Sequence, residues 1–249
     1  MHLNFLAPMA FLLALIGLVA PCAQAAQTSL ETVVAALQKP FQPTTRQNRI
    51  RDFQARFTQE AYLGSLDQLQ TASGRVVVSF ADQQTPVARF RWEYLQPDPQ
   101  LIVSDGRTLW VYVPENRQVI ESPVPAGAQA GEDNPLAFLT DLGNLSRQFT
   151  ISWGSPRKSP EGHFRLVLQP RQPSAYIEKL AVEVDKNVVA GKTGYPLLTA
   201  TLFGTSDNRT TVRFSEVSLN RSPAPSLYRF SPPPGTEIIR PGKGTAFEP

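Results

Sequence analysis

The chain has 249 residues, of which 41% are hydrophobic and 18% charged, a composition typical of a globular protein with one sizeable core. Its 23 prolines are about twice the usual proportion, which favours many short β segments over a helical bundle. The net charge is +3, but Lys and Arg are scattered among acids without forming a basic stripe, so nucleic-acid binding is not expected.

The N-terminus has the pattern of an export signal. Residues 5–20, FLAPMAFLLALIGLVA, are apolar, but the stretch is too short and too near the N-terminus for a comfortable membrane span. A small-x-small cleavage sequence ends at Ala25, so we expect a mature protein from Ala26. Cys22, the sole cysteine, follows a stretch that vaguely resembles a lipoprotein cleavage box, which leaves an acylated Cys22 or an uncleaved anchor as alternatives.

The residue types left after cleavage limit the available chemistry. His163 would be the only histidine and no cysteine would remain, which excludes a multi-histidine metal site and a cysteine nucleophile. A Ser-His-Asp triad would have to use His163, which lies in a loop entering a strand. Neither a G-x-x-x-x-G-K-[ST] loop nor a G-x-G-x-x-G motif is present. We therefore expect no cofactor, no metal and no enzymatic activity, although a hydrolase using paired carboxylates stays open.

The first element after the leader is a predicted helix from Thr28 to about Pro40. Thr28 and Glu31 have capping-box spacing, in which each side chain can satisfy the other residue's free backbone N–H. Pro40 ends the helix. One apolar stripe is formed by Leu30, Val33, Val34 and Leu37.

Most of the remaining chain shows the period-2 alternation of β-strands. Strands are predicted near 53–58, 75–80, 89–94, 101–104, 109–113, 148–153, 164–168, 180–184, 197–203, 211–219 and 227–230. The alternation slips at Glu216, which indicates a bulge, and a mobile tail is expected after Pro241. About ten or eleven strands joined by short turns predict an antiparallel meander, either a strongly curved sheet or an up-and-down barrel.

The hairpin at 101–113, LIVSDGRTLWVYV, poses a packing question. Asp105 and Gly106 both tolerate the positive φ of a tight primed turn. The second arm, Leu109–Val113, is apolar on both of its faces. We expect one face to pack on the concave side of the sheet, and the other beneath a helix, a chain terminus or a neighbouring segment.

Residues 121–142 interrupt the strands. A Pro/Ala/Gly loop at 121–134 leads to a predicted short helix at 135–142, with Asn134 as N-cap and proline at its first position. The helix carries too many apolar groups for a free surface, so it either forms a lid or plugs the end of a barrel. These groups are Leu136, Phe138, Leu139 and Leu142.

Four segments, in this order, resemble the outer-membrane lipoprotein carrier (LolA) family. They are IRDFQARFTQ at 50–59, FRW at 90–92, VSDGRTLWVY at 103–112 and FSPPPG at 230–235. The resemblance implies a mainly β fold: an unclosed, strongly curved antiparallel β-barrel, with a few short helices covering its concave side. It also implies a single domain over 26–240, and a monomeric periplasmic chaperone that holds the acyl chains of lipoproteins in an apolar cavity.

The resemblance further implies the partners. Acylated lipoproteins would come from an inner-membrane ATP-driven releasing complex and pass to an outer-membrane lipoprotein receptor. We expect large apolar side chains on the strands to line the cavity, because they supply the most apolar area. The expected lining is Phe90, Trp92, Tyr94, Trp110, Phe149, Ile151 and Trp153. A barrel filled entirely by its own side chains is the alternative that the pattern also allows.

One departure from the family pattern concerns lid closure. The family places an arginine directly before a proline, and this arginine bonds to the lid helix, but here Thr85 precedes Pro86. Arg89 alternates onto the face opposite Phe90 and is a poor substitute. A carrier of another lipid, or a membrane-anchored receptor or sensor of the same fold, therefore stays open.

Overall fold

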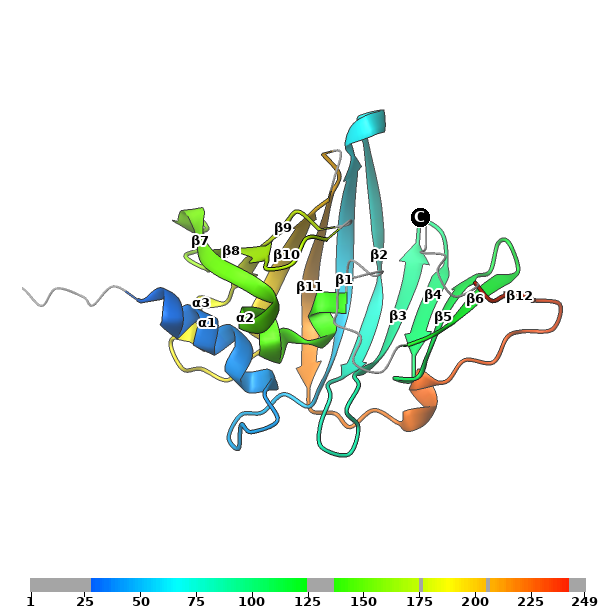
Figure 1. Ribbon diagram of the computed structural model, residues 1–249, viewed down its shortest axis with the longest axis horizontal. Helices are drawn as coiled ribbons and strands as arrows, with labels where there is room; N and C mark the ends of the chain where they lie inside the picture. Colours follow the sequence, from blue (N-terminus) through cyan, green and yellow to red (C-terminus); the bar gives the residue numbers. More distant parts are fainter. Residues whose placement is uncertain (1–27, 125–136, 175–176, 205–206, 242–249) are drawn as a thin grey trace, which may run out of the picture.

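A computed structural model describes residues 28–124, 137–174, 177–204 and 207–241. Across them runs one twelve-stranded sheet of order β12-β6-β5-β4-β3-β2-β1-β11-β10-β9-β8-β7 (Figure 1). The strands are β1 Asp52–Leu63, β2 Gln68–Ser79, β3 Arg89–Gln96, β4 Gln100–Ser104, β5 Thr108–Val113, β6 Gln118–Pro123, β7 Phe149–Lys158, β8 Phe164–Pro170, β9 Lys179–Val184, β10 Leu197–Phe203, β11 Arg209–Leu219 and β12 Glu237–Ile239. Because β7 and β12 stand at opposite ends of this order, the sheet is not closed, and the expected unclosed, mainly antiparallel fold is confirmed.

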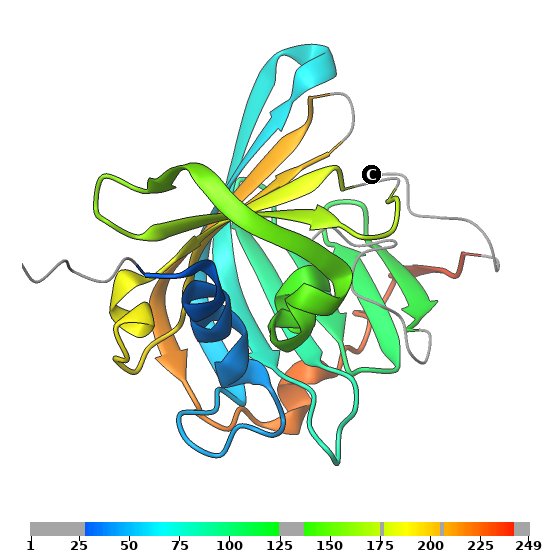
Figure 2. The same cartoon turned by 60° about the vertical axis from the view of Figure 1, so that its left-hand side comes forward.

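The strands curve around a set of short helices, which lie against one face of the sheet (Figure 2). The helical elements are α1 Leu30–Gln38, η1 Lys39–Phe41, η2 Gly64–Leu66, η3 Ala137–Thr140, η4 Leu142–Asn144, α2 Leu145–Gln148, α3 Lys186–Val189 and η5 Pro225–Tyr228. We call the sheet face that carries Phe53, Phe57 and Trp92 the inner face, and the opposite one the outer face. Within the described residues, no helix is both long and apolar enough to cross a membrane.

Helix α1 matches its prediction except at its cap. The Ser29 hydroxyl, rather than Thr28, accepts the backbone N–H of Thr32 at 3.2 Å. Val33 and Leu37 of the predicted stripe are fully buried, and Leu30 and Val34 pack against the core at its margin. The apolar stripe therefore places α1 against the inner side of the sheet.

Three other predictions are corrected, and one strand was not predicted. The helix predicted at 135–142 is a succession of η3, η4 and α2, because the backbone of Asp141 leaves helical geometry; residues 135–136 lie outside the described part. Strand β6 occupies the start of the predicted loop at 121–134, and its pairing with β5 over six residues overrides the local turn composition. Residues 227–230 form no strand, because Pro225 starts the 3-10 helix η5 instead. The three-residue strand β12 is too short for a period-2 signal.

The hairpin turn and the bulge have identifiable geometry. The connection between β4 and β5 contains three residues, of which only Gly106 has positive φ, at 88°. Asp105 acts through its carboxylate instead, which accepts the N–H groups of Arg107 and Thr108, both at 2.8 Å. The predicted bulge is confirmed: the β1–β11 register shifts opposite Glu216, whose φ is 50°.

The C-terminal segment covers the second face of β5. The rings of Tyr112 and Phe230 lie 5.3 Å apart on the outer face. The buried Tyr228 hydroxyl bonds to Ser79 Oγ at 2.7 Å, and its ring lies under the Arg89 guanidinium. Beyond it, β12 pairs in parallel with β6. A strap from the C-terminal part of the chain thus answers the packing question posed by Leu109–Val113.

Candidate functional site

A chain of aromatic rings crosses the middle of the inner face. Phe53 stacks on Tyr195 at 4.6 Å, and both rings meet the edge of Phe214, at 5.8 and 5.9 Å. The Phe214 ring lies 6.2 Å from Trp92, which in turn meets Phe57 at 4.7 Å. These residues come from β1, β3, β11 and the loop before β10, so the curvature of the sheet gathers them into one apolar surface.

Three of the predicted lining residues, Phe90, Trp92 and Tyr94, lie together on the inner face of β3. They pair with Val78, Val76 and Gly74 of β2, respectively. Trp92 is 3% exposed, whereas Phe90 and Tyr94 are half-buried at the margin of the core.

Tyr94 carries the polar end of this group. Its hydroxyl donates to Gln59 Oε1 at 3.0 Å, and burial raises the pKa of the phenol to about 12. The phenol is therefore neutral at any physiological pH.

The other predicted group, Phe149, Ile151 and Trp153, lies on the inner face of β7, at the far end of the sheet. Phe149 is buried, and Ile151 and Trp153 pack against the core. A groove of about 530 Å³ runs between this strand and α1. Its walls combine apolar side chains with the cations of Lys39 and Arg171.

Trp110 does not join either group. It pairs with Val103, whose neighbour along β4 pairs with Trp92, and successive side chains of a strand alternate between faces. The register therefore puts Trp110 on the outer face, on the side covered by the C-terminal strap.

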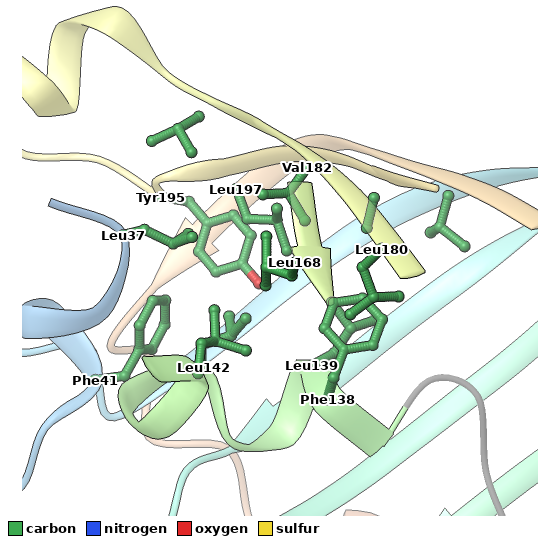
Figure 3. Packing of buried hydrophobic residues seen from close by; sticks show 14 of the residues in the cluster. Leu37, Phe41, Phe138, Leu139, Leu142, Leu168, Leu180, Val182, Tyr195 and Leu197 are labelled. Atoms are coloured by element: carbon green, nitrogen blue, oxygen red, sulfur yellow. The ribbon is translucent and has the colours of Figure 1, made fainter. Parts of the chain in front are cut away.

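Residues 138–148, which we call the covering segment, pack onto the inner face (Figure 3). Phe138, Leu139, Leu142 and Leu145 are each no more than 2% exposed and belong to the same buried cluster as Leu168, Leu180 and Leu197 of the sheet. Leu136, also predicted for this element, lies outside the described residues. In this structure, therefore, side chains of the protein itself fill the concave side beneath the covering segment.

A pair of hydrogen bonds fastens the covering segment to α1. Gln38, only 7% exposed, donates from Nε2 to Ser146 Oγ at 2.7 Å and accepts the Ser146 backbone N–H at 2.9 Å. Gln42 donates to the Gly143 carbonyl and Arg171 to the Ser146 carbonyl, both at 3.3 Å. These contacts lie at the edge of the segment, beside the groove, and they would break if the segment separated from α1 and from the residues that follow η1 and β8.

Asp141 organises the covering segment internally. Its carboxylate accepts Asn144 Nδ2 at 2.6 Å and Gln148 Nε2 at 2.7 Å. Burial raises the pKa of this carboxyl, and the two hydrogen bonds oppose that shift only in part.

A second hollow, of about 1140 Å³, lies between the β1–β2 hairpin and the turn from β3 to β4. Its walls include Gln59, Gln70, Gln96 and Gln100, so it offers hydrogen-bonding groups over much of its surface. An alkyl chain would leave those groups without partners, so this hollow suits an acyl chain poorly.

Comparison with known proteins decides the family. The sequence model of the family "Outer membrane lipoprotein carrier protein LolA" matches residues 48–231. The chain belongs to this family. An outer-membrane lipoprotein carrier protein from Coxiella burnetii is 30% identical over 232 residues, covering 92% of this chain and 93% of that protein. One from Dechloromonas aromatica is 27% identical over 189 residues, covering 76% and 81%.

Among solved structures, a LolA superfamily protein from Nitrosomonas europaea aligns with a TM-score of 0.39 and 12% identity. The alignment covers 80% of this chain and 97% of that one.

Arg89 does not supply the LolA-family arginine contact to the covering segment, whereas Arg171, from another part of the chain, donates to the Ser146 carbonyl there. Arg89 lies on the outer face, where its guanidinium carbon is 5.1 Å from the centre of the Tyr228 ring. Gln38 and Ser146 supply the fastening contacts in its place. Their separation of 108 residues leaves no periodicity or motif by which the sequence could have indicated this pair.

His163 does not have the geometry of a catalytic triad. Its Nδ1 accepts the Lys186 backbone N–H at 3.3 Å and lies 3.5 Å from Asp185 Oδ1. In a triad, that nitrogen would donate to the carboxylate.

Proposed function

We propose that the protein is a periplasmic chaperone that carries lipoproteins by their acyl chains from the inner to the outer membrane. The single observation that supports this is the way in which the covering segment is held on the inner face. The apolar side chains of the covering segment occupy the apolar inner face (Figure 3), while polar contacts at the edge fasten the segment to α1. An acyl chain would take the place of those side chains when the covering segment lifts.

The magnitudes favour such an exchange. Transfer of an acyl chain into water costs about 0.8 kcal/mol per CH₂, so a chain of roughly fifteen carbons would cost on the order of 12 kcal/mol. Burial of four large apolar side chains contributes about 1.5–3 kcal/mol each, or roughly 6–12 kcal/mol together. Because the two amounts are similar, the acyl chain can displace the covering segment, and the segment can help to expel the chain later.

The family supports the direction of transport and the partners. Relatives over most of the chain are named outer-membrane lipoprotein carrier proteins. We infer that an inner-membrane ATP-driven complex loads the lipoprotein and that an outer-membrane lipoprotein receptor accepts it. The mass of the mature N-terminus tests the location: cleavage after Ala25 gives a free periplasmic protein, whereas an acylated Cys22 would indicate a membrane-anchored one.

A covalent tether on the covering segment tests the mechanism. In the mature chain, which has no native cysteine if cleaved after Ala25, Gln38→Cys and Ser146→Cys would be bridged by a short bismaleimide reagent. We expect the bridged protein to lose uptake of a labelled lipoprotein from inner-membrane vesicles, while the unbridged double variant keeps it.

The matched control bridges Gln118→Cys to Glu237→Cys, which contact each other at 2.8 Å where β6 meets β12. This bridge should leave uptake unchanged. Equal uptake with and without the Gln38–Ser146 bridge would contradict the proposal.

A further inference from the structure

Tyr195 carries a buried hydroxyl that the packing of the inner-face cluster does not explain. Its side chain belongs to the loop between α3 and β10, is 7% exposed, and is stacked on Phe53. Its hydroxyl oxygen is buried and has no hydrogen-bond partner among the described residues. Leaving a buried hydroxyl without a partner costs about 1–3 kcal/mol, so native proteins rarely keep one without a reason.

The hydroxyl points into the region where cargo would lie. In Figure 3 its oxygen is directed into the cluster, toward Leu168 of the sheet and Leu142 of the covering segment. A resident water is a poor explanation, because a buried water needs two to four polar partners, and the rings that contact Tyr195 and the side chains labelled around its oxygen in Figure 3 are apolar. A group that arrives when Leu142 is displaced would give the hydroxyl its missing partner.

The surroundings define the chemistry of that group. Burial raises the pKa of the Tyr195 phenol, which therefore stays protonated and can donate a hydrogen bond. The rings that contact Tyr195, those of Phe41, Phe53 and Phe214, are uncharged, so an anionic acceptor placed among them would leave water without a compensating cation. A neutral acceptor attached to an alkyl chain fits these conditions, and the carbonyl of an acyl ester or amide is such a group.

We propose that the Tyr195 hydroxyl binds the carbonyl oxygen of an acyl chain and thereby fixes how deep the chain enters. This inference rests on the proposed carrier function and adds a chemical preference to it. An acyl chain would be bound more tightly than an alkyl chain of the same length that lacks the carbonyl. The hydroxyl would thus fix the position at which the carbonyl group ends and the hydrocarbon of the bound chain begins.

The test compares Tyr195→Phe with wild type on two ligands. One is a diacylglyceryl-cysteine peptide with an isotope-labelled ester carbonyl, and the other is its dialkyl ether analogue. We expect the variant to bind the diacyl peptide roughly five- to tenfold more weakly and the ether analogue within about twofold of wild type. The infrared band of the bound ester carbonyl should lie at lower frequency in wild type than in the variant, a signal that altered packing alone would not produce.

Tyr228→Phe is the matched control, since its hydroxyl already bonds to Ser79 on the outer face. In the empty proteins, Tyr195→Phe should leave the melting temperature unchanged or raise it, while Tyr228→Phe should lower it. An unchanged carbonyl band, or equal affinity losses for both ligands, would overturn the role of Tyr195. So would a loss of melting temperature as large as that of the control. If wild type bound neither peptide, the carrier function itself would fail instead.

Discussion

Replacing Gln38 by Leu should release the covering segment without unfolding the protein. The variant keeps the approximate volume of the side chain but removes its bond to Ser146 Oγ and its acceptor for the Ser146 N–H. Each bond contributes about 0.5–1.5 kcal/mol net, so the pair contributes roughly 1–3 kcal/mol. The equilibrium between attached and detached segment should therefore shift by roughly 5- to 150-fold.

Hydrogen exchange of the backbone amides at 138–148 measures this shift directly. We expect their protection to fall by that factor, while the amides of β1 and β2 keep theirs, because the paired strands open only with the whole sheet. A fluorescent fatty acid should bind the variant more readily for the same reason.

Gln118→Leu provides the control, because it removes a comparable glutamine contact with Glu237 far from the covering segment. It should change neither the exchange at 138–148 nor fatty-acid binding. Ser146→Ala, which keeps the backbone N–H, should give a smaller effect than Gln38→Leu, and the two together should be less than additive. Unaltered protection at 138–148 in Gln38→Leu would refute the reasoning.

Three further predictions concern stability. Leu142→Ala should lower the free energy of unfolding in urea by about 2–5 kcal/mol, because the side chain is fully buried; a loss below 1 kcal/mol would mean that the site is loosely packed. Asp141 has a raised pKa in the folded state, so its contribution to stability is greatest below the unfolded pKa of 3.8 and is lost as the pH rises through the folded value. Asp141→Asn removes this pH-dependent contribution, so the free energy of unfolding of wild type minus that of the variant should decrease as the pH rises above 3.8. A difference that does not change with pH would contradict the raised pKa. Gly74→Ala should prevent correct folding, because its Cβ would overlap the Glu93 carbonyl oxygen and approach the Phe57 ring to 2.9 Å; a soluble variant of normal melting temperature would contradict the packing.

The fold could largely be predicted from the sequence, because a strand that buries one face alternates apolar and polar residues. Strands such as 164–168 and 180–184 follow that rule closely. Strand β6 could not be predicted, because proline and polar residues follow it and its stability comes from pairing with β5. At 227–230 the alternation was present, but Pro225 and the packing of Tyr228 against Ser79 produced a 3-10 turn.

The site was less predictable, since it depends on contacts between distant segments. Strand periodicity alone is enough to predict that Phe90, Trp92 and Tyr94 lie on one face of the sheet, and the register confirms it. Its aromatic side chain favours a place for Trp110 in the cavity, but the face of the sheet on which it lies follows only from the register between β4 and β5. Tyr195 and Gln38 gave no signal at all: one lies in an irregular loop, and the other has its partner in α2.

The free edges of the sheet, β7 at one end and β12 at the other, give the molecule a freedom that a closed barrel lacks (Figure 1). In a closed barrel the number and stagger of the strands dictate the girth, so a wider load would demand broken pairing. Here the two free borders can spread or approach while all eleven neighbouring pairs stay intact. For the proposed carrier, the inner face would then widen for thicker cargo through a small change in twist distributed over the whole sheet.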